Sequence, residues 1–182
     1  LLIGGDANQP SAALYAIPVI RDGGGHITGF AGSASLVAAA NGPVNGGIDG
    51  GLGYLTGGVI GLTTFPDNAF VQIRPGSVGP DKTIVLTDLG VIDSVGSWSQ
   101  VPTGFPGAGR LKILSYYLGH WYDAALVPDG TGTFDITGAT PIAPMGAGPE
   151  EIEYASGDQP GFGTPVILVA KYDGGRIDLY AM

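Results

Sequence analysis

The chain has 182 residues, of which 44% are hydrophobic and only 13% are charged, so it can bury one real core and is not a disordered polyelectrolyte. Sixteen acidic residues against seven basic ones give a formal net charge of -9, which argues against binding to nucleic-acid phosphates. The absence of cysteine excludes disulfides and thiolate chemistry, and no apolar run reaches the roughly 20 residues of a membrane span.

Residues 1–47 are expected to form three strands, the third of which consists of two segments. We expect strands over residues 1–4 and 13–20, followed by a Gly-rich turn over 21–26 that supplies the positive φ angles of a hairpin. Residues 27–30 and 35–39 then form the return strand. This unit therefore lacks an inner strand.

The next two stretches each predict a complete unit of four short strands separated by Gly- and Pro-marked turns. In the first of them we expect strands over 48–55, 59–64, 69–74 and 82–87. In the second we expect strands over 95–101, 110–116, 120–127 and 131–137. A last unit has three strands, over 150–155, 166–171 and 176–181, so its fourth strand is missing.

This order predicts a single all-β domain over residues 1–182, with units of about 1–47, 48–93, 94–148 and 149–182. If Leu52, Trp98 and Ile152 are equivalent, the repeat is about 46 and then about 54 residues long, as expected for four-stranded antiparallel propeller blades. A β-sandwich would also have many short strands, but it does not require the same turn order in every unit. We therefore favour a β-propeller-like array.

Seven segments along nearly the whole chain carry a family resemblance: 14–22, 25–30, 48–52, 72–77, 102–111, 127–135 and 148–150. In the same order, they resemble segments of a group of secreted bacterial β-propeller proteins that are similar in style to the NHL and SMP-30/gluconolactonase propellers. The resemblance implies an extracellular or periplasmic location. Members usually have about six blades, which implies that this chain corresponds to part of a ring.

Two arrangements of the units stay open. They form either a small closed ring of four blades or a partial ring whose end sheets expose unpaired strand edges. In the second case we expect a partner at those edges, either a homo-oligomer or a remainder of the same polypeptide.

Inner propeller strands line a central channel, so the repeat is expected to bring Asp49, Ser94 and Glu150 to one mouth of it. Converging carboxylates suit Ca²⁺, and the SMP-30-like resemblance implies a divalent cation held by carboxylate and Asn ligands. This sequence shows no clear Asn at the equivalent positions. Asp49 and Glu150 are the candidate metal ligands; the alternative is that they cap turns or bind neighbouring amides.

The densest polar and aromatic cluster is His120, Trp121, Tyr122 and Asp123. Alternation along a strand would place His120 and Tyr122 on one face and Trp121 and Asp123 on the other, which makes the cluster a candidate ligand-binding site. The alternative is packing of Trp121 between blades, with Asp123 tying a turn.

No serine-hydrolase, zincin or nucleotide-binding motif occurs in the sequence. The leading hypothesis is therefore a non-catalytic propeller module that acts by binding or by self-assembly. The rival is a divalent-cation-dependent lactonase or esterase that uses Asp49 and Glu150. Glycan binding through Trp98, Trp121 and the tyrosines is a third hypothesis.

Overall fold

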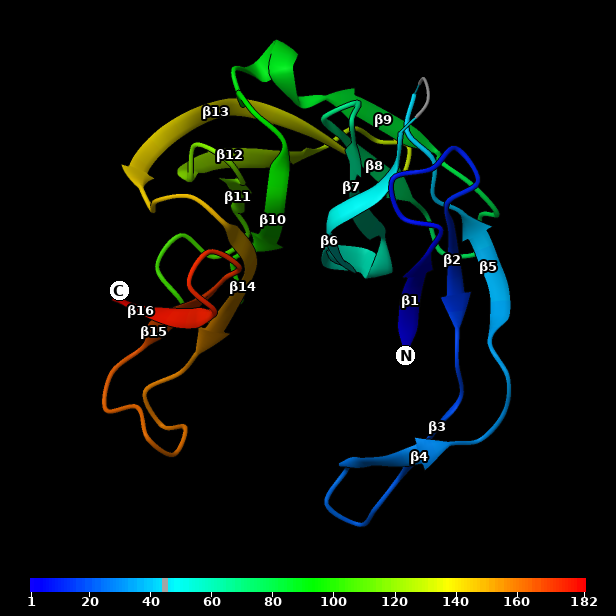
Figure 1. Cartoon of the computed structure of the whole chain (residues 1–182), viewed down its shortest axis with the longest axis horizontal. Coiled ribbons are helices and arrows are strands. Elements are labelled where there is room, and N and C mark those ends of the chain that lie inside the picture. Colours follow the sequence, from blue (N-terminus) through cyan, green and yellow to red (C-terminus); the bar gives the residue numbers. More distant parts are fainter. Residues whose placement is uncertain (44–45) are drawn as a thin grey trace.

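The computed structural model describes residues 1–43 and 46–182, and these residues form antiparallel β-sheets with two short 3₁₀ helices. The sheets follow one another in chain order along an open arc, with the two termini on either side of its opening (Figure 1). The predicted all-β class is confirmed. In the described part of the chain, no helix has the length and apolar character needed to cross a bilayer.

The first sheet has the order β1-β2-β5, and a separate two-stranded hairpin, β3-β4, projects beyond it (Figure 1). Their bounds are β1 (Leu2–Gly5), β2 (Ala13–Ala16), β3 (Val19–Arg21), β4 (Ile27–Phe30) and β5 (Ser35–Ala39). The expected single strand over 13–20 is therefore wrong. Pro18 interrupts it, because proline has no N–H to donate to a ladder and restricts the residue before it.

The second and third sheets have four strands each, in sequential order, as predicted. Their bounds are β6 (Gly47–Tyr54), β7 (Ile60–Phe65), β8 (Ala69–Ile73) and β9 (Lys82–Val85), then β10 (Val95–Gln100), β11 (Leu111–Ser115), β12 (His120–Pro128) and β13 (Phe134–Pro144). The 3₁₀ helices η1 (Thr56–Gly58) and η2 (Leu86–Leu89) follow β6 and β9. The last sheet has three strands, again as predicted: β14 (Pro149–Ala155), β15 (Val166–Lys171) and β16 (Arg176–Ala181).

The fourth strand of the third sheet differs most from its expected bounds. We expected residues 131–137, whereas β13 begins at Phe134 and continues to Pro144. The Asp129 carboxylate explains the late start, because it accepts hydrogen bonds from the backbone N–H groups of Thr131 and Thr133 at 2.8 and 3.3 Å. These residues therefore belong to a side-chain-capped turn.

Strand register confirms the proposed equivalence of Leu52, Trp98 and Ile152. Each lies on the first strand of its sheet and pairs with a residue two positions before the one at which the register shifts: Leu62 before Thr64, Ile113 before Ser115 and Val169 before Lys171. The repeat inferred from the sequence therefore corresponds to a repeat of strand pairing.

Apolar clusters lie between successive sheets, so each middle sheet is covered on both faces. On β8, for example, Phe70 points into the cluster shared with the third sheet and Val71 into the cluster shared with the first sheet. A third cluster joins the third sheet to the last one through Leu114, Met145 and Ile152. The sheets therefore pack face to face along the arc.

A buried amide also links the second and third sheets. The fully buried Gln72 side chain donates to the Phe134 carbonyl oxygen at 2.7 Å and accepts from the Phe134 N–H at 2.8 Å. It thereby binds the backbone of β13 as a neighbouring strand would.

Candidate functional site

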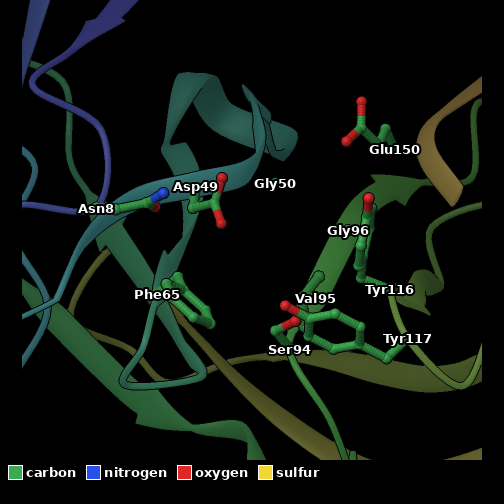
Figure 2. A pocket seen from close by; sticks show the side chains of 10 residues that line it. All are labelled: Asn8, Asp49, Gly50, Phe65, Ser94, Val95, Gly96, Tyr116, Tyr117 and Glu150. Atoms are coloured by element: carbon green, nitrogen blue, oxygen red, sulfur yellow. The ribbon is translucent and has the colours of Figure 1, made fainter. Parts of the chain in front are cut away.

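A pocket of about 320 Å³ lies where the first strands of the second, third and last sheets approach one another (Figure 2). Asp49 comes from β6, Ser94 directly precedes β10 and Glu150 comes from β14. The three residues expected to meet at one mouth thus share a pocket. Its full lining is Asn8, Asp49, Gly50, Phe65, Ser94, Val95, Gly96, Tyr116, Tyr117 and Glu150.

Each of the three strands has a β-bulge at the pocket. Ile48 pairs with Thr64, Val95 with Ser115 and Pro149 with Lys171, and in each strand the register shifts immediately afterwards. A bulge turns the inserted residue out of the regular alternation and bends the strand. Gly96 and Glu150 are the single inserted residues of β10 and β14, whereas in β6 the three residues Asp49, Gly50 and Gly51 lie opposite Thr63 alone.

The three residues reach the pocket from different places relative to their strands. Asp49 and Glu150 lie within β6 and β14, whereas Ser94 reaches the pocket from the loop before β10.

Glycines allow the three strands to approach backbone to backbone. A Cβ atom on Gly50 would lie 2.1 Å from the Val95 carbonyl oxygen of the next sheet. A Cβ atom on Gly96 would collide with the Pro149 carbonyl oxygen of the last sheet. The same close contact thus recurs at both junctions and fixes the position of Asp49 relative to Glu150.

Aromatic side chains form another repeat around the pocket. Phe65 and Tyr116 directly follow Thr64 and Ser115, which pair with the residue before each bulge, and both line the pocket. Tyr172 has the equivalent position in the last sheet and lines a neighbouring groove together with Glu150. The sequence analysis missed these three residues, although the sequence has an aromatic residue at the end of each second strand or directly after it.

Asn8 also lines the pocket, which the sequence analysis did not foresee. It lies in the turn between β1 and β2 with a φ of 62°, and its N–H donates to the Ile48 carbonyl oxygen at 3.2 Å. Figure 2 shows its side chain beside Asp49. The Asn8 amide, which comes from the first sheet, therefore lies next to the candidate carboxylate of Asp49.

Partial burial alters the acid–base behaviour of the pocket. Desolvation raises the pKa of Asp49 and outweighs the hydrogen bond from the Gly50 N–H, which favours the charged form. Desolvation, together with the negative charge of Glu150, also raises the pKa of the Tyr116 hydroxyl. Burial therefore favours the protonated forms of both Asp49 and Tyr116.

The carboxylates of Asp49 and Glu150 come from different sides of the pocket (Figure 2). Among residues 1–43 and 46–182, no three His, Asp or Glu side chains gather closely enough to hold a metal ion. A cation here would therefore need oxygens from other groups, such as the Asn8 amide, the Ser94 hydroxyl or backbone carbonyls.

The His120–Asp123 cluster lies outside this pocket and takes part in packing. His120 and Tyr122 share one face, as expected, with the His120 Nδ1 atom 3.4 Å from the Tyr122 hydroxyl oxygen. Tyr122 is 1% exposed and belongs to the core. The Trp121 ring packs edge-on against Tyr180 of the last sheet, with centroids 6.5 Å apart.

Asp123 binds two cations on the neighbouring strand. Its carboxylate accepts from Arg110 Nε at 2.7 and 2.9 Å and from Lys112 Nζ at 2.6 Å. These interactions lower the pKa of Asp123 against the opposing effect of desolvation, which is the largest single contribution. The contacts of Trp121 thus agree with the alternative that this cluster packs between sheets. Asp123 does not tie a turn, as that alternative expected, but joins two strands.

Trp98 cannot stack on a glycan as the third hypothesis required. It is 5% exposed and packs edge-on against Phe70 at 4.9 Å, and Cβ atoms on Gly51 or Gly61 would collide with its ring. Its role is to fill the core between the second and third sheets.

Comparison with known protein families, with curated proteins and with solved structures gives no match. The resemblance to secreted propellers therefore stays a prediction based on the motifs in the sequence. The functional argument depends on the geometry of the chain itself.

Proposed function

We propose that the chain is a non-catalytic β-propeller-type module that acts outside the cytoplasm by binding or self-assembly. Two observations support this proposal: successive sheets stack face to face, and the first strands of the second, third and last sheets approach one another around one pocket, as blades around a channel would. The exported location is supported by the motif resemblance alone.

One observation carries the assembly role. The sheets at the two ends of the arc each keep an apolar outer face, shown by Leu36 at 67% exposure and Leu179 at 59%. The middle sheets bury both of their faces, so the end sheets lack the cover that this architecture provides elsewhere.

Size-exclusion chromatography with light scattering over a wide concentration range tests this role. We expect the mass to rise above the 18.3 kDa of one chain as concentration increases. A stable monomer at every concentration would contradict self-assembly and leave only a binding role.

A second candidate is a divalent-cation-dependent hydrolase of lactones or related esters. The observation in its favour is that Asp49, Glu150 and the Asn8 side chain line one pocket. A bound Ca²⁺ would polarise a carbonyl oxygen or activate a water molecule there.

Calcium titration followed by calorimetry and thermal unfolding tests this candidate. We expect a rise in melting temperature with Ca²⁺ that Asp49→Asn abolishes and that Asp88→Asn, at an exposed position, preserves. Absence of calcium binding to the wild-type chain eliminates the hydrolase.

A further inference from the structure

On β15 and β16 the last sheet has an apolar face that points away from the rest of the chain, bordered on β14 by the exposed Glu153, which pairs with Leu168. Along β15, alternate residues pack into the third core cluster, while Leu168 and Ala170 lie on the opposite side and are half-buried. They pair with Leu179 and Ile177 of β16, which are 59% and 63% exposed. A strand that is apolar on both sides is typical of a sheet covered on both faces. We call this surface the trailing face.

The first sheet has a matching face at the other end of the arc. Leu14 of β2 is fully buried toward the second sheet, whereas its neighbour Tyr15 lies on the outer side. Tyr15 pairs with Ile3 of β1 and with Leu36 of β5, so the three side chains form one row across the sheet. We call this surface the leading face.

The junctions inside the chain show how such faces are used. The trailing side of each earlier sheet packs on the leading side of the next, as the core clusters on both sides of β8 show. The leading face of the first sheet and the trailing face of the last sheet are thus the two halves of one more junction of the same kind. One chain carries both halves, at opposite ends of the arc (Figure 1).

We propose that a second copy of the chain docks head to tail, with its leading face on the trailing face of the first. The inference rests on the proposed role in self-assembly. It adds the identity of the partner, the two surfaces in contact and the head-to-tail orientation of the two copies. The contact is heterologous: Leu179 of one copy meets the row of Ile3, Tyr15 and Leu36 of the other. It continues the face-to-face stacking already present between the four sheets.

Single arginine substitutions can block either face separately. Leu36→Arg blocks the leading face and Leu179→Arg blocks the trailing face, and both side chains are more than half exposed, so the fold of one chain should tolerate the change. Ile142→Arg, at a 49% exposed position on β13 away from both faces, is the matched control. If Leu179→Arg lowers the melting temperature, Ile177→Arg on the same face replaces it.

Light scattering and sedimentation velocity on each variant, and on an equimolar mixture, give the decisive measurement. We expect either blocking variant alone to associate at least about tenfold more weakly than wild type, because a buried leucine is replaced by a charge. The mixture should regain a two-chain species, since each variant supplies the face that the other lacks. Ile142→Arg should behave as wild type.

The possible outcomes distinguish the head-to-tail contact from self-assembly in general. A monomeric wild-type chain refutes both. Association of the wild type that persists in both blocking variants refutes the head-to-tail contact but keeps self-assembly. Strong association of one blocking variant alone shows that like faces meet, and this also overturns the proposal.

Discussion

The backbone contact between the second and third sheets can be tested by substituting two glycines that have the same positive φ angle. Gly50 and Gly57 both have a φ of 79°. A Cβ on Gly50 would lie 2.1 Å from the Val95 carbonyl oxygen, whereas a Cβ on Gly57 would meet nothing within 4 Å. The comparison of Gly50→Ala with Gly57→Ala therefore controls for the cost of the positive φ angle and reports on the contact between strands.

The expected magnitudes follow from these geometries. Alanine in the left-handed region costs about 1–2 kcal/mol, so Gly57→Ala should destabilise the chain by that amount. Gly50→Ala adds the collision with a carbonyl that belongs to a strand ladder and cannot rotate away, for about 1–3 kcal/mol more. At this chain length the additional loss corresponds to a further fall of about 2–12 °C in melting temperature.

Urea unfolding followed by tryptophan fluorescence measures the difference, because Trp98 lies at this junction. We expect the midpoint to fall in the order wild type, Gly57→Ala, Gly50→Ala, with unchanged slopes. Equal midpoints for the two variants would refute the reasoning, since β6 and β10 would then stand too far apart for the Val95 carbonyl to matter.

Three further predictions concern single polar side chains. Gln72→Leu should lower the unfolding free energy by about 2–4 kcal/mol, because it leaves the backbone groups of Phe134 unpaired in the core; a neutral result in chemical denaturation contradicts this. Lys171→Met should destabilise the loop before β14, whose Met145 and Gly146 carbonyls accept from the Lys171 ammonium, and faster hydrogen exchange there would show it. Arg74 lowers the pKa of Asp81 to about 2, so wild-type stability should fall as pH drops from about 3.8 toward 2 more steeply than in Asp81→Asn; parallel acid-unfolding curves would be the opposite result.

Much of the sheet order could be predicted from the sequence because turns and strands repeat locally. Glycine and proline mark the turns, and the apolar residues at Leu52, Trp98 and Ile152 recur at positions that pair in the same way. Where a side chain competes with the backbone, prediction failed. Pro18 broke an expected strand, and Asp129 delayed the start of β13 by capping the preceding turn.

The candidate site could be predicted only in part, for a different reason. Asp49 and Glu150 were identified because both lie in the repeated first strand. Asn8 comes from a unit without that strand, and its place depends on a backbone with a φ of 62° and on a hydrogen bond to Ile48. Residues that reach a site from outside the repeat leave no periodic signal, so only the folded geometry can reveal them.

Glu150 connects the two surfaces on which the functional proposals depend. It lines the pocket with Asp49, and it also lines the groove beside Tyr172 and Ile177 at the edge of the trailing face. A second copy on that face would cover one side of Glu150, which desolvates the carboxylate and narrows access to the pocket. If the chain assembles through that face, we expect binding in the pocket and assembly to be coupled: by linkage, a ligand that contacts Glu150 would change the association constant by the same factor as association changes the affinity for the ligand.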